Sequence, residues 1–279
     1  MRCFSAALLV SLFLAAPVSA QPSSDTASVP LDTWLGPFRS VTLTVGGDSA
    51  RFLFDTGGGV TVLDEAFAGE VGCRPWGRIV GFRAGGDRVD LERCPALPIM
   101  MRGVPLDASD LAVWDLQGFL DRVLPGIERP PVDGVLSLKT LAARPFTLRL
   151  AERRLTLETE RSFRRQIADM HPLRSRLATG PDGDELTVFV RGAVSDTGWF
   201  LVDSGNLDLV QTGPHLRPRS ADSAETWEAV LTLEGLPGIP TEFRTREIIY
   251  DGVLSEEFLR YWVLAFDLST NGVWASAVR

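Results

Sequence analysis

The sequence contains few cysteines and histidines, and this scarcity excludes several classes of enzyme site. Its 279 residues include three cysteines and two histidines, His171 and His215. No Cys-x-x-Cys pair is present, so the ligand spacing typical of structural zinc sites is absent. A serine or cysteine triad needs a histidine beside its nucleophile, and two isolated histidines give such a triad no support. We expect neither a metal nor an organic cofactor.

Long apolar runs are absent after the first twenty residues. Arg2 is followed by an apolar stretch at residues 6–16, and Val18, Ser19 and Ala20 end this stretch with small residues. This pattern predicts a secretory signal peptide over residues 1–20, with cleavage after Ala20. The run is too short to span a bilayer. We therefore expect no membrane span after cleavage, and a periplasmic or secreted mature protein.

Loss of the signal peptide would leave a single pair of cysteines. Cys3 would be removed, and Cys73 and Cys94 would remain. An even number of cysteines in an exported protein favours a disulfide between them.

Positive charge is also scarce. Lys139 is the only lysine, and the formal net charge is −8. Removal of Arg2 with the signal peptide makes the charge −9, one unit lower. An acidic chain of this kind is a poor partner for nucleic acid, so we expect none.

One stretch, residues 51–60, places an acidic residue where burial would be costly. An apolar strand leads into Asp55, Thr56 and Gly57, and two more glycines follow. A carboxylate at the end of an apolar strand is unfavourable unless it is used, because desolvation penalises its charged form. The same design recurs 148 residues later, where an apolar strand leads into Asp203, Ser204 and Gly205.

A second element of the sequence is also duplicated. The Asp-Gly-Val-Leu-Ser sequence ending at Ser137 recurs in the segment ending at Ser255. From there the two segments align without a gap, so that Leu148 corresponds to Phe266. Two copies of one plan predict a pseudo-symmetric pair of lobes, which would bring Asp55 and Asp203 together. Alternating apolar and polar residues, with frequent Gly and Pro turns, predict an all-β chain.

These motifs resemble those of two-lobed aspartic proteases of the pepsin and retropepsin group, over about residues 41–277. The resemblance implies a pseudo-two-fold pair of β-barrel lobes with the active-site cleft between them. It also implies a peptide or protein substrate, a monomer, and two catalytic aspartates, Asp55 and Asp203, that hold the attacking water. The residues that brace the two loops would be Thr56, Gly57, Ser204 and Gly205.

Residues 78–91 predict a β-hairpin with a glycine tip at Gly85 and Gly86. In the family that this chain resembles, such a hairpin closes over the substrate as a flap. Pepsin-like flaps carry a tyrosine, whereas Phe82 is the nearest aromatic residue here. The residues that follow the two Asp-Thr/Ser-Gly turns, Gly58 and Asn206, also depart from the small, hydroxylated residue usual in the family.

The order of these elements predicts the domain organisation. After the signal peptide we expect a flexible tail over residues 21–37 and an N-terminal lobe over residues 38–158. A connection over residues 159–185 leads to a C-terminal lobe over residues 186–279. The longer middle of the first half includes the hairpin and a Pro-rich loop at residues 118–131.

Three functions fit these observations. The first is an exported aspartic endopeptidase that hydrolyses peptide bonds with a water activated between two aspartates. The second is a pepsin-like protein that binds peptides without cutting them. The third is a β-rich exported protein whose carboxylates bind a cation or a small ligand, which explains each aspartate but not the repeat.

Overall fold

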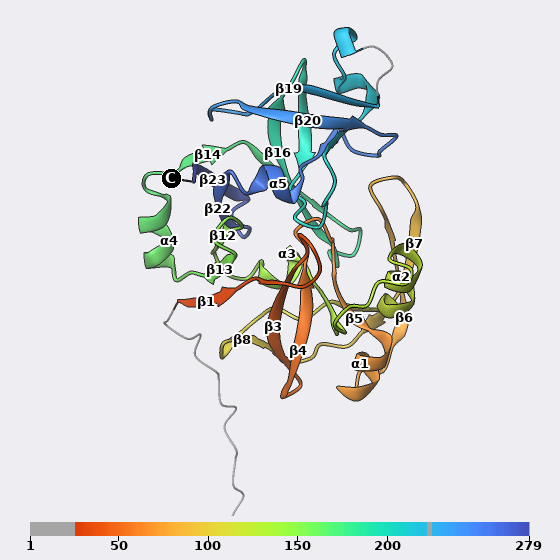
Figure 1. Cartoon of the computed structure of the whole chain (residues 1–279). Helices are drawn as coiled ribbons and strands as arrows, with labels where there is room; N and C mark the ends of the chain where they lie inside the picture. Colours follow the sequence, from red (N-terminus) through yellow and green to blue (C-terminus); the bar gives the residue numbers. More distant parts are fainter. Residues whose placement is uncertain (1–25, 222–224, 279) are drawn as a thin grey trace, which may run out of the picture.

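The computed structural model describes residues 26–221 and 225–278, and these form a mainly β, two-lobed fold (Figure 1). This confirms the predicted all-β class. The predicted signal peptide lies outside the described residues. Within the described ranges, no helix combines the length and the apolar character needed to span a membrane.

The N-terminal lobe is built on a ten-stranded sheet. Its strands are β2 (Asp32–Thr33), β3 (Arg39–Val45), β4 (Asp48–Phe54), β5 (Thr61–Asp64), β6 (Trp76–Phe82), β7 (Arg88–Cys94), β8 (Ile99–Met101), β9 (Val104–Pro105), β10 (Leu111–Trp114) and β11 (Gly134–Leu136).

The C-terminal lobe is built on a seven-stranded sheet. Its strands are β15 (Ser175–Thr179), β16 (Leu186–Ala193), β17 (Thr197–Leu201), β18 (Val210–Thr212), β19 (Thr226–Leu233), β20 (Ile239–Thr245) and β21 (Gly252–Val253). The helices of the chain are short: α1 (Glu65–Glu70), α2 (Leu116–Val123), α3 (Leu138–Leu141), α4 (Glu160–Ile167), α5 (Glu256–Leu259), and the 3-10 helices η1 (Pro214–Leu216) and η2 (Arg219–Ala221).

A third sheet of six strands, which we call the central sheet, joins the two lobes. It contains β1 (Ala27–Pro30), β12 (Phe146–Arg149), β13 (Arg154–Leu157), β14 (His171–Leu173), β22 (Trp262–Asp267) and β23 (Gly272–Ala277), in the order β1-β13-β12-β22-β23-β14. Two of its strands lie in segments for which the sequence predicts other roles: β1 within residues 21–37 and β14 within residues 159–185.

The central sheet has the symmetry that the repeat predicts. β12 pairs with β22 so that Thr147 lies opposite Ala265, which is its counterpart in the repeat. On either side of this pair, β1 adds to β13 and β14 adds to β23 with equivalent registers. The order β1-β13-β12 in one half of the sheet therefore corresponds to the order β14-β23-β22 in the other half. Phe146 and Phe266 stack across the junction, with 4.8 Å between ring centroids, so the two halves share one buried core.

The repeated Asp-Gly element has a structural role in each lobe. The Asp133 carboxylate accepts a hydrogen bond from the Arg51 N–H at 2.6 Å, and Asp251 accepts one from the Trp199 N–H at 2.8 Å. Each carboxylate therefore fixes the strand that leads to Asp55 or Asp203. The adjacent glycine is required because a Cβ at Gly134 would overlap the Phe52 ring.

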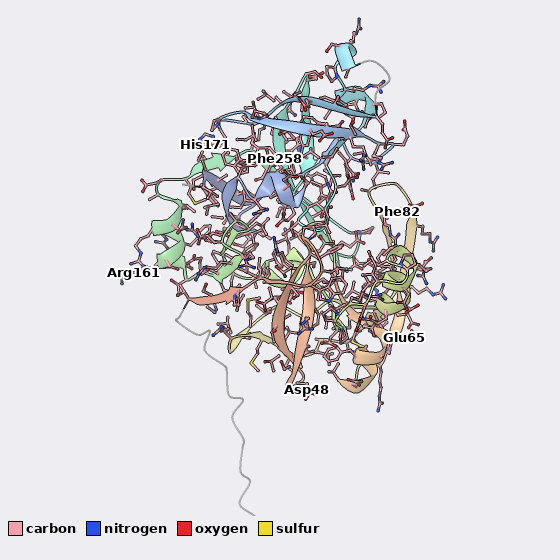
Figure 2. All side chains as sticks on the ribbon, in the orientation of Figure 1. Asp48, Glu65, Phe82, Arg161, His171 and Phe258 are labelled. Carbon is pink, nitrogen blue, oxygen red and sulfur yellow. A yellow bond between two sulfur atoms is a disulfide. The ribbon has the colours of Figure 1, made fainter. Side chains whose placement is uncertain are left out.

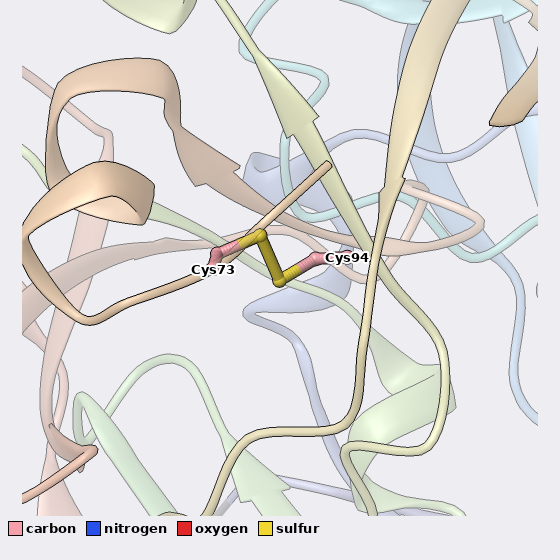
Figure 3. Close-up of a disulfide and its surroundings, with 2 residues drawn as sticks. All are labelled: Cys73 and Cys94. Carbon is pink, nitrogen blue, oxygen red and sulfur yellow. A yellow bond between two sulfur atoms is a disulfide. The ribbon is translucent and has the colours of Figure 1, made fainter. Parts of the chain in front are cut away.

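The predicted disulfide between Cys73 and Cys94 is present (Figure 3). It joins the segment after α1 to the end of β7, with 5.9 Å between the two Cα atoms, a separation usual for disulfides. The bond therefore anchors the base of the β6–β7 hairpin to the N-terminal lobe.

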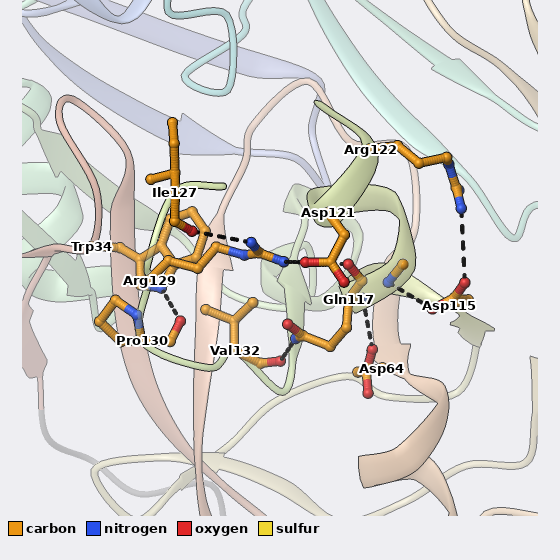
Figure 4. Close-up of polar contacts among 11 residues, drawn as sticks. Trp34, Asp64, Asp115, Gln117, Asp121, Arg122, Ile127, Arg129, Pro130 and Val132 are labelled. Carbon is orange, nitrogen blue, oxygen red and sulfur yellow. Dashed lines mark hydrogen bonds and ion pairs between the residues drawn. The ribbon is translucent and has the colours of Figure 1, made fainter. Parts of the chain in front are cut away.

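The Pro-rich segment at residues 118–131, expected to be a loop, contains most of α2. Asp115 caps this helix by accepting a hydrogen bond from the Gly118 N–H at 2.7 Å. Arg129 bonds Asp121 at 2.5 Å, and the Trp34 indole donates to the Pro130 carbonyl at 2.8 Å (Figure 4). These contacts hold α2 and the following turn against the lobe, because N-terminal capping and burial outweigh the local preference for a turn.

Candidate active site

Each predicted catalytic aspartate follows a central strand of its lobe. Asp55 follows β4, which is flanked by β3 and β11, and Asp203 follows β17, which is flanked by β16 and β21. Backbone N–H groups from the glycine turns meet the carboxylates. Gly57 donates to Asp55 Oδ1 at 2.8 Å, and Gly205 donates to Asp203 Oδ1 at 2.8 Å. Both aspartates are half-buried.

The two turns interlock at the interface between the lobes. The Thr56 N–H donates to Ser204 Oγ at 3.0 Å, and the Ser204 N–H donates to Thr56 Oγ1 at 2.9 Å. The Thr56 hydroxyl also donates to the Val202 carbonyl at 2.8 Å. Both side chains are buried, so these hydrogen bonds are shielded from water.

The two glycines allow each aspartate to approach the opposite turn. A Cβ on Gly57 would overlap the Asp203 carboxyl group, and a Cβ on Gly205 would overlap the Asp55 carboxyl group. The structure therefore brings together all six residues that the sequence predicts for the catalytic pair and its support: Asp55, Thr56, Gly57, Asp203, Ser204 and Gly205.

The proximity of the carboxyl groups changes their electrostatics. Burial, and then the charge of Asp55, raise the pKa of the Asp203 carboxyl well above its ordinary value. A hydrogen bond with the Asp55 side chain acts in the same direction, and the N–H groups of Gly205 and Asn206 oppose it. Because two neighbouring like charges disfavour double ionisation, the charge of Asp55 favours the protonated form of Asp203.

Asp55 lies in a cleft of about 330 Å³ between the lobes. The N-terminal lobe contributes an apolar wall that includes Val60, Leu91 and Trp114, and the C-terminal lobe contributes a more polar wall. The residues of this second wall are Ala178, Thr179, Glu185, Thr187, Phe189 and Tyr250.

The predicted flap is a hairpin formed by β6 and β7. It extends from the N-terminal lobe beside the C-terminal lobe (Figure 1), and Phe82 lies near its tip (Figure 2). Phe82 lines the cleft and is 59% exposed. Gly86 has a φ of +85° and lies in the tip together with Gly85. At this tip the Ile249 N–H donates to the Ala84 carbonyl at 2.9 Å, so the hairpin bridges the two lobes.

Sequence reasoning did not identify two cleft residues of the C-terminal lobe. Glu185 ends a Gly-, Pro- and Asp-rich turn, and nothing in the repeat distinguishes it. Tyr250 directly precedes the repeated Asp251, so the alignment of the two halves indicates that it lies near the two aspartates. The alignment does not indicate that its side chain lines the cleft. Burial, and then the charges of Glu185 and Asp203, raise the pKa of the Tyr250 hydroxyl, which keeps it a neutral hydrogen-bond donor.

In the part of the chain that the structure describes, no three His, Cys, Asp or Glu side chains are grouped so that they could hold a metal ion.

No protein-family model matches the sequence, and no curated protein matches it. Among solved structures, the chain is similar to basic 7S globulin from soybean, a protein of pepsin-like fold, with a TM-score of 0.54 and 12% sequence identity. The match covers 90% of this chain and 94% of the globulin chain. At this identity the similarity shows the fold alone. The chain thus has a pepsin-like, two-lobed β fold.

Proposed function

We propose that this protein is an aspartic endopeptidase. The observation that carries the proposal is the interlocked pair of Asp-Thr/Ser-Gly turns, which brings two carboxyl groups from two lobes to one site beside a cleft. The soybean globulin supports the fold, and its name states no peptidase activity, so the activity rests on the site itself.

The mechanism follows from two carboxyl groups that share one proton. The ionised member accepts a proton from a water molecule, whose oxygen attacks the carbonyl carbon of the peptide bond. The protonated member donates a hydrogen bond to the carbonyl oxygen and stabilises the charge that develops there. The carboxyl group that accepted the proton from water then transfers it to the amide nitrogen, and the C–N bond breaks, which releases a carboxylic acid and an amine.

The remaining predicted residues take supporting roles in this proposal. Thr56, Gly57, Ser204 and Gly205 fix the distance and the orientation of the two carboxyl groups. Phe82 contacts a substrate side chain, while Gly85 and Gly86 allow the tip of the flap to move. Both aspartates belong to one chain, so we propose that a monomer is sufficient.

An exported location fits the same proposal. The Cys73–Cys94 disulfide is typical of proteins that fold in an oxidising compartment. We propose a periplasmic or secreted protein.

One observation favours the second candidate function, a peptide-binding protein without activity. The residue after Asp-Thr-Gly is Gly58, and a Cβ there would lie 3.3 Å from Asp55 Oδ2. A side chain at this position could reach that oxygen with a hydroxyl group, and glycine supplies none. The two functions differ in one measurable property, which is hydrolysis.

The test is digestion of a peptide library by the purified chain over a range of acidic to neutral pH, with and without pepstatin, followed by mass spectrometry. We expect pepstatin-sensitive cleavage, and we expect Asp55→Asn and Asp203→Asn each to lose about a thousandfold or more in kcat/KM. Asp48→Asn, at the exposed start of β4 and at the far end of the N-terminal lobe (Figure 2), serves as the matched control. Binding without cleavage by the wild-type protein would establish the second function instead.

A further inference from the structure

Glu185 extends across the cleft between the catalytic turn and the flap. A Cβ added to Gly59 would lie 3.4 Å from the Glu185 Cβ and 3.6 Å from its Cδ. A Cβ added to Gly81, on the flap strand β6, would lie 3.0 Å from Glu185 Oε1. The two glycines thus leave room for this one side chain, and its carboxylate lies in the wall of the cleft.

The acidic neighbours of Glu185 in the β15–β16 turn are neutralised, whereas Glu185 is not. Arg93 pairs with Asp182 at 2.9 Å and with Asp184 at 2.7 Å, which holds the turn against the flap strand β7. Among the described residues, no lysine, arginine or histidine nitrogen lies within 4.0 Å of the Glu185 carboxylate. The two ion pairs of Arg93 therefore fix the position of Glu185 without neutralising its charge.

The other charged and titratable groups nearby do not supply a counter-ion. Lys139 reaches the same turn, but its ammonium donates to the Gly183 carbonyl at 2.7 Å and lies 3.7 Å from Asp110. Asp55, Asp203 and Asp184 are acidic, and Tyr250 is a neutral donor. Arg83 also lines the cleft, but its guanidinium lies over the Phe119 ring, 4.4 Å from the centroid, and over the Trp114 ring. Burial, and then the charge of Asp184, raise the pKa of the Glu185 carboxyl, as expected for an acid without a cationic partner.

We propose that Glu185 is a specificity-determining residue and that the cleft prefers peptides that present a lysine or arginine side chain to it. This inference rests on the proposed peptidase function and names its substrate class. A half-buried carboxylate without a partner gains a charge-assisted hydrogen bond when a cationic side chain enters, and it repels an acidic one. The adjacent apolar wall, with Val60, Leu91 and Trp114, accommodates the aliphatic part of such a side chain or a neighbouring apolar residue.

The test uses a set of decapeptides with a central Leu-Phe pair, in which each flanking position in turn carries lysine, norleucine or glutamate. Norleucine retains the aliphatic chain of lysine and removes its charge. At one position we expect the wild-type protein to cleave the lysine peptide about tenfold or more faster, in kcat/KM, than the norleucine peptide. In Glu185→Gln this ratio should fall to about two or less, and lowering the pH should reduce the wild-type ratio as Glu185 becomes protonated.

The matched control is Glu228→Gln, which removes the same charge from an exposed position on β19 in the C-terminal lobe and should keep the wild-type ratio. Thermal melting checks that each variant is folded. A wild-type protein without a lysine preference at any position, or a Glu185→Gln variant that keeps the preference, would overturn the inference.

Binding of the same peptides, labelled with a fluorophore, to Asp55→Asn separates this inference from the proposed activity. If the wild-type protein cleaves nothing, the peptidase proposal fails. Tighter binding of the lysine peptides, lost in the Asp55→Asn/Glu185→Gln double variant, would still support the subsite. Equal binding of lysine and norleucine peptides would overturn it, whatever the outcome for cleavage.

Discussion

Thr56 and Ser204, 148 residues apart in the sequence, each accept a hydrogen bond from the backbone N–H of the other. The exchange is reciprocal, so neither turn can shift without breaking a hydrogen bond of the other. Because the carboxyl groups of Asp55 and Asp203 are carried by these turns, their separation is set by four buried backbone and side-chain groups.

Replacement of Thr56 by valine tests this arrangement. Valine keeps the shape of threonine but leaves the Ser204 N–H and the Val202 carbonyl without their partner, each at a cost of about 1–3 kcal/mol. We expect a corresponding loss in the free energy of unfolding, measured with urea, and a lower kcat. Thr42→Val, at an exposed position on β3, is the control. Equal stability of the two variants would contradict the role assigned to Thr56.

The raised pKa of Asp203 predicts a specific dependence of stability on pH. A carboxyl whose pKa is higher in the folded than in the unfolded state stabilises the fold fully at low pH, and this contribution is lost as the pH rises through the folded-state pKa. Asp203→Asn removes the carboxyl group and, with it, the free-energy cost of ionising this group in the folded state. The variant should therefore be more stable than the wild type near neutral pH, and the difference should disappear in acid.

Denaturant unfolding between about pH 3 and about pH 8 measures the Asp203 effect. Asp48→Asn again controls for the change of an exposed aspartate to asparagine. A wild-type protein that is as stable as Asp203→Asn at neutral pH would show that the pair carries no electrostatic penalty.

The flap predicts separate effects on kcat and KM. Gly86 has positive φ, which a β-branched residue resists, so Gly86→Val should disturb the tip and slow turnover more than it lowers the melting temperature. Phe82→Ala removes an apolar contact made in both the ground state and the transition state, so it should mainly raise KM. Gly103→Val is the control, because Gly103 also has a positive φ but lies in the turn between β8 and β9 and does not line the cleft. Unchanged kinetics in the first two variants would make this an edge hairpin without a role in turnover.

Removal of the disulfide should destabilise the N-terminal lobe. The bond closes a loop with a sequence separation of 21, and the chain-entropy model gives such a bond about 3 kcal/mol. We expect a Cys73→Ala/Cys94→Ala variant to lose about this much stability in urea. Mass spectrometry of unreduced, alkylated wild-type protein provides the direct check, because two alkylated thiols would show that the bond does not form.

The sequence was sufficient to predict the all-β fold and the Cys73–Cys94 bond, both of which are confirmed. The alternating pattern and the repeat predicted the fold, because two copies of the same apolar strand and Asp-Gly element restrict the possible arrangements. The disulfide followed from the even number of cysteines left after loss of the signal peptide. The roles of Asp55 and Asp203 in catalysis stay predictions, although the structure brings them together.

Other features of the fold and of the site depend on tertiary contacts that the local sequence pattern does not predict. α2 begins at Leu116 and extends into residues 118–131, which were expected to form a loop. It forms because Asp115 caps it and its apolar side packs on the lobe. β1 is a four-residue strand within a segment expected to be a tail, and it is ordered by pairing with β13. Glu185 and Tyr250 line a cleft that is formed by residues of both lobes, so their place in the site follows from tertiary structure.

The central sheet also determines how the protein should unfold. β12 and β22 come from different halves of the chain, and every residue of β12 pairs with β22. Separation of the lobes would therefore expose an unpaired edge and the Phe146–Phe266 stack on both sides. We therefore expect the two halves to melt as a single cooperative unit, with equal calorimetric and van't Hoff enthalpies. Two resolved transitions in scanning calorimetry would show instead that each half is an independent folding domain.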